Sequence, residues 1–148
     1  MSTARRSVLI ASDHAGYDLK ERLKKSRPDI EWIDKGPPDT ARVDYPDFAD
    51  RVAREVIRDG KLGVLVCGSG QGMAIRANKY RGIRAALVYS DEIAKLSREH
   101  NDANILCLGA RVSDHTAAER WLEIFLTTPF AGGRHADRVT KLGFAAEC

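Results

Sequence analysis

A cysteine at the head of a glycine-rich segment is the clearest chemical feature of the sequence. Cys67 ends an apolar run and is followed by Gly68-Ser-Gly-Gln-Gly72, after which a helical pattern begins. Closely spaced glycines let backbone N–H groups converge on an anion, and a helix N-terminus adds partial positive charge. The segment suits a bound phosphate or an oxyanion formed during a reaction. A thiol at a helix N-terminus has a lowered pKa, which makes Cys67 a candidate base or nucleophile, although free cysteines are often buried structural residues.

The surroundings of Cys67 argue against three other kinds of site. The glycine spacing differs from G-x-G-x-x-G and follows the third expected strand rather than the first, which disfavours a dinucleotide site. Cysteine phosphatases require an arginine six positions after the cysteine, where this chain has Met73. A signalling receiver domain requires an aspartate at the position of Cys67. An anion-binding or acid–base site therefore remains the best interpretation.

Two histidines have a polar residue next to them in the sequence, and each such pair could act together in binding or catalysis. Asp13 precedes His14 at the expected end of the first strand, and His100 precedes Asn101 at the end of a helical pattern. A carboxylate beside an imidazole can orient the ring, keep it charged or bind sugar hydroxyls. Each histidine could equally cap a turn or a helix, and both interpretations stay open.

Arginines form a second candidate group towards the end of the chain. Arg134 and Arg138 are four residues apart, so they share one face of a helix. With His135 and Arg111 they could clamp a phosphate, because arginine binds phosphate oxygens in a bidentate way. A solvated basic helix face is the alternative, and the excess of arginine over lysine, 16 against 8, also fits a bias of composition.

Short apolar runs alternate with helical patterns along the chain, and this alternation sets the expected fold. The alternation predicts a parallel sheet covered by helices on both faces, with chemistry at the carboxyl ends of the strands. The expected strands are 7–12, 30–34, 62–67, 83–89 and 104–108, and the expected helices are 17–26, 47–59, 73–80, 91–100, 113–127 and 134–146.

Composition places the chain among soluble globular proteins. Its 148 residues are 43% hydrophobic and 30% charged, which fits a single domain over 1–148, and the net charge of +3 is too small to indicate nucleic acid. No apolar run approaches the ~20 residues that span a bilayer, and no signal-peptide pattern follows the basic start. The three cysteines are widely spaced, which is typical of reduced thiols, and no metal-ligand spacing is present. We expect a cytoplasmic protein with no metal, membrane or nucleic-acid partner.

Seven short motifs together resemble the sugar-phosphate isomerase family of ribose-5-phosphate isomerase B, which also includes galactose-6-phosphate and allose-6-phosphate isomerases. They occur in order over nearly the whole chain, and as a set they are highly specific. The motifs are Ser12-Asp-His-Ala-Gly16, Asp44-Tyr-Pro46, Val66-Cys-Gly-Ser-Gly-Gln-Gly72, Ala77-Asn-Lys79, Gly82-Ile-Arg-Ala85, Leu96-Ser-Arg-Glu-His-Asn101 and Gly132-Gly-Arg-His135.

The resemblance implies a three-layer α/β/α Rossmann-like fold with a five-stranded parallel sheet. It implies a homodimer, in some members paired into a tetramer, whose active sites lie at the interface and are completed by the partner. The helix expected over 134–146 would then pack on the partner subunit. No metal or organic cofactor is implied.

The resemblance also implies roles for individual residues. Cys67 would be the base that shuttles a proton between C1 and C2 of the sugar, and Met73 fits this role because members without the cysteine use a glutamate at that position. Ser69 and the backbone of Gly68, Gly70 and Gly72 would stabilise the enediolate. The remaining implied roles are ring opening by His100, sugar contacts by Asp13, Tyr45 and Asn101, and phosphate binding by His14, Arg111, Arg134 and Arg138.

The expected activity is interconversion of ribose 5-phosphate and ribulose 5-phosphate through an enediolate. Within the same chemistry, the substrate could instead be allose 6-phosphate, galactose 6-phosphate or a tetrose 4-phosphate, because the sequence does not give the depth of the pocket. A sugar-phosphate sensor without catalysis is the alternative of a different class, since a fold does not fix a function.

Overall fold

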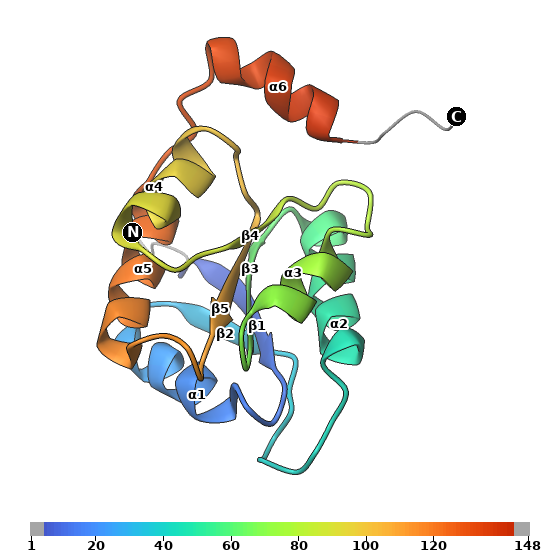
Figure 1. Cartoon of the computed structure of the whole chain (residues 1–148), viewed down its shortest axis with the longest axis vertical. Coiled ribbons are helices and arrows are strands. Elements are labelled where there is room, and N and C mark those ends of the chain that lie inside the picture. The colour runs from blue at the N-terminus through green and yellow to red at the C-terminus, as the bar shows by residue number, and fades with distance from the viewer. Residues whose placement is uncertain (1–4, 144–148) are drawn as a thin grey trace.

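The fold is built on one parallel sheet. The computed structural model describes residues 5–143. Its five strands lie in the order β2-β1-β3-β5-β4, and every neighbouring pair is parallel (Figure 1). The strands are β1 (Ser7–Ser12), β2 (Glu31–Asp34), β3 (Leu62–Cys67), β4 (Ala85–Leu87) and β5 (Ile105–Gly109). The helices are α1 (Tyr17–Ser26), α2 (Tyr45–Asp59), α3 (Gln71–Ala77), α4 (Asp91–Glu99), α5 (His115–Thr127) and α6 (Arg134–Leu142).

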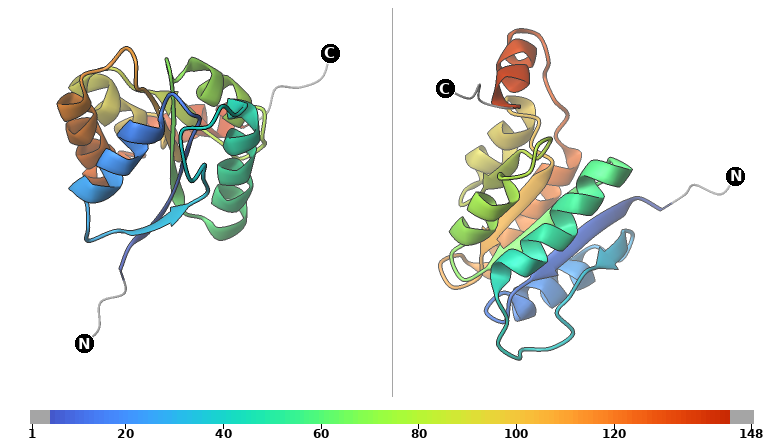
Figure 2. Two further views of the ribbon diagram at one scale, coloured as in Figure 1. Left: turned by 90° about the horizontal axis from the view of Figure 1, so that it is seen from below. Right: turned by 90° about the vertical axis from the view of Figure 1, so that its right-hand side faces the viewer.

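Helices cover both faces of the sheet, which confirms the expected three-layer α/β/α arrangement. Helices α1, α4 and α5 pack with one side of the strands into a core that includes Leu19, Val64 and Phe125. Helices α2 and α3 pack on the other side, where Val52, Leu65 and Met73 are buried together. Figure 2 shows the two helical layers on either side of the sheet. Because both faces are covered, the central strands are apolar on both faces rather than on alternate residues.

Several element boundaries differ from those expected. Helix α2 begins at Tyr45 rather than at position 47, because Pro46 occupies the first turn, where a proline needs no hydrogen-bond partner for its nitrogen. Strand β4 is confined to Ala85–Leu87 instead of 83–89, because it lies at the edge of the sheet and pairs only with β5. Helix α3 takes in Gln71 and Gly72 at its start and ends at Ala77 rather than at 80.

Helix α6 is unlike the other helices because none of its residues is buried. It follows the Pro129–Gly133 segment and lies outside the layered body, beyond the end of α4, where His135 stacks on His100 (Figure 1). The helix was expected to reach residue 146; it is observed to Leu142, and residues 144–146 lie outside the described part of the chain. Between residues 5 and 143, no helix has both the length and the apolar character needed to cross a membrane.

Candidate functional site

A cavity of about 440 Å³ opens at the carboxyl ends of β1 and β3, where the parallel sheet predicts chemistry. Cys67 is the last residue of β3, and Asp13 follows β1 directly. Ser69 and Gly72 come from the glycine segment, and Arg111 comes from the turn after β5. The complete lining is Asp13, Tyr45, Cys67, Gly68, Ser69, Gly72, Arg111 and Val112.

The thiol of Cys67 lies at the floor of this cavity and is held by a backbone amide. The residue is 4% exposed, and the N–H of Gly70 donates to its Sγ at 3.2 Å. Gly70 has a φ of +80°, and a Cβ there would lie 2.9 Å from the carbonyl carbon of Leu108, so the turn requires glycine. An N–H directed at the sulfur stabilises a thiolate more than a thiol. The glycine turn therefore fixes the position of this sulfur beside the cavity.

Ser69 and Tyr45 complete the walls around the thiol. The hydroxyl oxygen of Ser69 accepts a hydrogen bond from the N–H of Gln71 at 3.3 Å. Tyr45, the first residue of α2, lies against Gly72, where an added Cβ would fall 2.4–2.7 Å from atoms of its ring. The close contact fixes where the phenol group stands, because no larger residue at position 72 leaves room for it.

Asp13 and His14 lie close to the thiol cavity but do not bond to each other. Asp13 is 6% exposed, and its Oδ1 accepts from the N–H of Gly16 at 2.9 Å. Nδ1 of His14 accepts from the N–H of Val43 at 3.3 Å, which leaves Nε2 for a ligand. Within residues 5–143 no hydrogen bond joins the two side chains, and each is held instead by a backbone N–H.

A second cavity, also of about 440 Å³, adjoins the first and shares Asp13 and Tyr45 with it. Its lining includes His14 and Arg42, and sequence reasoning missed this arginine. Arg42 lies two residues before the Asp44-Tyr-Pro46 motif, and that proximity was the only signal in the sequence that could have revealed it.

The other candidate residues lie near the amino ends of the strands, at the end of the sheet opposite the Cys67 cavity. Helix α4 starts near the carboxyl ends of the strands and runs back, so His100 and Asn101 stand close to the start of β5. The His100 ring stacks on His135 with centroids 4.1 Å apart and an interplanar angle of 15°. Desolvation, and then the nearby His100, Arg134 and Arg138, lower the pKa of His135.

The single chain thus divides the predicted site into two groups. One group surrounds Cys67 and comprises Asp13, His14, Tyr45, Gly68, Ser69, Gly70, Gly72 and Arg111. The other comprises His100, Asn101, Arg134 and Arg138, near α4 and on α6. Arg111 and the two arginines of α6 belong to different groups, so one chain alone does not form the arginine clamp that their sequence pattern suggested.

Two further features limit the chemistry. Cys107 is fully buried in β5, and burial together with the nearby Cys67 raises the pKa of its thiol, as expected for a structural cysteine. Over residues 5–143, the structure contains no group of three or more histidine, cysteine, aspartate or glutamate side chains placed to hold a metal ion.

Comparison with known proteins assigns the chain to a family. The model of the Ribose/Galactose Isomerase family matches residues 8–142. The chain therefore belongs to that family of sugar isomerases.

Particular relatives share both sequence and fold with this chain. It is 39% identical over 142 residues to ribose-5-phosphate isomerase B of Escherichia coli, an alignment that covers 93% of this chain and 94% of the relative. It is similar to the crystal structure of the ribose 5-phosphate isomerase of Thermotoga maritima, with a TM-score of 0.91, 43% identity and coverage of 95% and 99% of the two chains. The ribose 5-phosphate isomerase B of Anaplasma phagocytophilum gives a TM-score of 0.88 at 50% identity, with coverage of 97% and 100%.

Proposed function

We propose that this protein is an aldose–ketose isomerase that interconverts ribose 5-phosphate and ribulose 5-phosphate. The observation that carries the proposal is the Cys67 thiol, which faces a cavity containing Arg111 and accepts a hydrogen bond from the N–H of Gly70 at 3.2 Å. Relatives named ribose-5-phosphate isomerase B align with nearly the entire chain, which supports this choice among phosphorylated sugars.

The Cys67 thiolate acts as the base. It removes the proton from C2 of the open-chain aldose, the C2–H electrons form the C1=C2 double bond, and the carbonyl π electrons move to O1. The protonated sulfur then returns the proton to C1, while the hydroxyl proton of O2 is transferred to O1, which yields the ketose. A base of this kind contributes ~10²–10⁴-fold to the rate.

The glycine segment stabilises the negative charge that develops on the two oxygens. Gly68, Ser69 and Gly72 of this segment line the cavity beside the thiol, so their backbone N–H groups and the Ser69 hydroxyl are near the place where charge forms. Asp13 and Tyr45 line the same cavity and contact the sugar hydroxyls. His14 and Arg111 bind the phosphate, and binding energy from this remote group positions the reacting carbons.

A second copy of the chain completes the site. Ring opening by His100, sugar contact by Asn101 and phosphate binding by Arg134 and Arg138 require those residues to reach the Cys67 cavity, from which their own chain holds them apart. Helix α6 has no buried residue, so its packing surface is available to a partner. We therefore propose a homodimer, with the whole of 1–148 acting as one isomerase domain and α6 packing on the partner subunit.

The cytoplasm is the proposed location. Cys67 and Cys107 are both free thiols in the structure, and a catalytic thiol requires a compartment that keeps it reduced.

Direct assay of purified protein tests the proposal. Ribose 5-phosphate, allose 6-phosphate, galactose 6-phosphate and erythrose 4-phosphate are compared by kcat/KM, and we expect the highest value for ribose 5-phosphate. The reaction in deuterium oxide separates an isomerase from a sensor, because only the isomerase exchanges the carbon-bound proton with solvent. Binding of ribose 5-phosphate without turnover or exchange would contradict the proposed activity.

A further inference from the structure

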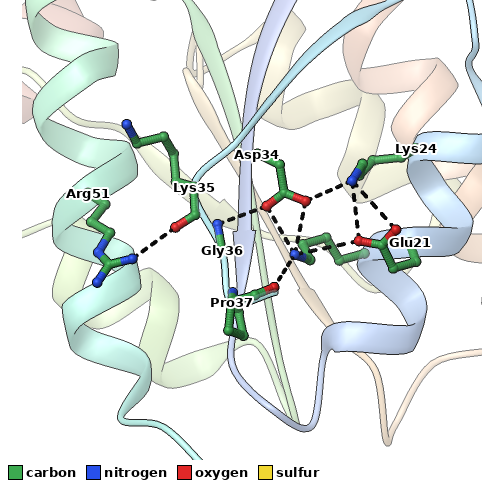
Figure 3. Close-up of polar contacts among 8 residues, drawn as sticks. Glu21, Lys24, Asp34, Lys35, Gly36, Pro37 and Arg51 are labelled. Carbon is green, nitrogen blue, oxygen red and sulfur yellow. Dashed lines mark hydrogen bonds and ion pairs between the residues drawn. The ribbon is translucent and has the colours of Figure 1, made fainter. Parts of the chain in front are cut away.

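A larger cavity, of about 820 Å³, lies away from the thiol beside the edge strand β2. Helices α1 and α2 form its two sides, and the segment after β2 runs between them (Figure 3). Its lining residues are Glu21, Lys24, Asp34, Lys35, Gly36, Pro37, Pro38, Arg51, Arg54, Glu55 and Arg58. None of these residues lines either cavity of the candidate active site, so a ligand here would occupy a separate position.

A buried lysine fixes the wall of this cavity. Lys20 is 0% exposed, and its Nζ donates to both carboxylate oxygens of Asp34 at 3.0 Å and to the carbonyl oxygen of Pro37 at 2.8 Å. Partial burial alone would raise the pKa of Asp34, but hydrogen bonds from Lys24, the N–H of Gly36 and Lys20 lower it below its ordinary value. The segment from Asp34 to Pro37 is thus anchored before any ligand arrives.

The carboxylates of the cavity already have cationic partners. Asp34 pairs with Lys20 at 3.0 Å and with Lys24 at 2.7 Å. Glu21 also pairs with Lys24, at 3.2 Å. Glu55 pairs with Lys35, and it lies 3.8 Å from Arg58. The negative charge of the wall is therefore matched by lysines and by Arg58.

Two arginines of α2, Arg51 and Arg54, form no close ion pair among residues 5–143, although Asp50 attracts Arg54 at longer range. Nη1 of Arg51 donates to the carbonyl oxygen of Lys35 at 3.1 Å, and its guanidinium lies 4.5 Å from the Phe48 ring centroid. Arg54 lies 6.0 Å from the ring centroid of Tyr80. In the described part of the chain neither guanidinium forms an ion pair within 4.0 Å, and the nearby Asp50 pairs with Arg76 at 2.7 Å instead.

Arg51 and Arg54 are three residues apart, so they project from one side of α2. Their planar groups match phosphoryl oxygens in a way that a lysine does not. The cavity volume falls within the range of ~300–1,000 Å³ that is usual for small-molecule sites. We propose that this cavity is a second anion site, which binds a small phosphorylated molecule through Arg51 and Arg54.

Calorimetric titration of the full-length protein with inorganic pyrophosphate at low ionic strength tests the proposal. The wild-type protein is expected to show binding at the substrate site and at this cavity. The double variant Arg51→Gln, Arg54→Gln should lose the second class of site or bind there about tenfold or more weakly, because two charge-assisted hydrogen bonds are removed. Its kcat/KM for ribose 5-phosphate should stay within about twofold of wild type, since neither arginine lines the substrate cavities.

A matched control removes the same charge elsewhere. Arg22→Gln with Arg120→Gln deletes two exposed arginines of α1 and α5, which pair with Glu119 and Asp91. This control should keep both classes of pyrophosphate binding. Unchanged stoichiometry and affinity in the Arg51, Arg54 variant would overturn the proposal, and so would an equal loss in the control. Neither result depends on whether the protein is an isomerase, which the turnover assay decides separately.

Discussion

Two regions contribute to the proposed active site, and they differ in exposure. The region around Cys67, at the carboxyl ends of the strands, is enclosed, whereas the region around α6 is exposed. Around Cys67 the structure is enclosed: the thiol is 4% exposed, and its neighbour Gly70 is confined by the backbone of Leu108. Around α6 the groups are presented to the outside, on a helix without a buried residue. The first region is shaped by the chain's own core, whereas the second offers side chains that this core does not position.

The enclosed region holds the proposed base, whereas the exposed region holds groups proposed to bind the sugar phosphate and to open its ring. Proton transfer requires a base held to a fraction of an ångström, which a buried strand end provides. Phosphate binding by arginine tolerates a surface helix, because the attraction between full charges acts over a longer range than a proton transfer. In the proposed site, each chain therefore supplies the base, and the partner chain supplies the remaining groups.

The largest effect is expected at the enclosed region. Replacing Cys67 by alanine removes the base, so kcat should fall by ~10²–10⁴-fold. The KM for ribose 5-phosphate should change little, because the phosphate contacts remain. Steady-state kinetics with the sugar phosphate measure both constants. Near-normal turnover by this variant would show that another group takes the proton, and Cys107→Ala serves as the control for loss of a buried thiol.

A second comparison concerns a buried and an exposed ion pair and their effects on the free energy of unfolding. Asp34→Asn removes the closer of the two carboxylates beside the buried Lys20 and leaves only Glu21, at 3.6 Å, so we expect the free energy of unfolding to fall by about 2–3 kcal/mol at pH 7. Because the pKa of Asp34 is lowered in the folded protein, its contribution is present above about pH 4 and is lost as the pH falls further. The wild type should therefore lose this stability on acidification, whereas the variant lacks that component. Urea denaturation at several pH values measures it.

Glu99→Gln is the matching change at the exposed region. Glu99 lies 3.7 Å from Lys95 and 3.9 Å from His100, and its side chain is 34% exposed. A surface pair of this kind is worth ~0–1 kcal/mol, so unfolding should change by less than that amount. Equal losses from the Asp34 and Glu99 variants would contradict the expected difference between a buried and an exposed ion pair.

Removing one arginine of α6 should affect binding. Arg138→Ala deletes a charge-assisted contact to the phosphate, which corresponds to about a tenfold or larger loss in kcat/KM. The loss should appear mainly in KM, and the temperature of unfolding should stay close to wild type because Arg138 is exposed. An unchanged KM would remove Arg138 from the proposed phosphate site.

Mixing two inactive variants gives the smallest signal but examines the two-chain site most directly. Cys67→Ala lacks the base, and His100→Asn lacks the ring-opening group, so each homodimer is inactive. In the proposed homodimer, mixed dimers formed by subunit exchange would contain one intact site, and activity should recover to about a quarter of wild type if chains pair at random. Absence of any recovery after demonstrated exchange would contradict a site shared between subunits.

The sequence was sufficient to predict the layers and the location of the thiol. Continuous apolar strands such as 62–67 and the helical stripe of α2 have few alternatives, and a parallel sheet then fixes the edge where Cys67 lies. The strand order was not predictable from these patterns, because they show which face is buried but not which strand is the neighbour.

Contacts between distant segments account for what the sequence did not reveal. Lys20 sits in a helical pattern in which a lysine is normally solvated, and its burial follows from Asp34 and Pro37, 14 and 17 residues further along. The start of α2 was misplaced because Pro46 was interpreted as a breaker rather than as a first-turn residue. Arg42 was missed because the cavity that it lines is formed only when the loop before α2 folds against β1.

The contact between Tyr45 and Gly72 makes these two positions interdependent. A methyl group at position 72 would meet the phenol group of the exposed Tyr45, so Gly72→Ala requires the Tyr45 side chain to shift or to become smaller. Changes at the two positions are therefore non-additive, and relatives that exchange one should exchange the other. Since Tyr45 lines both cavities, its placement also helps to set the room available for a longer sugar.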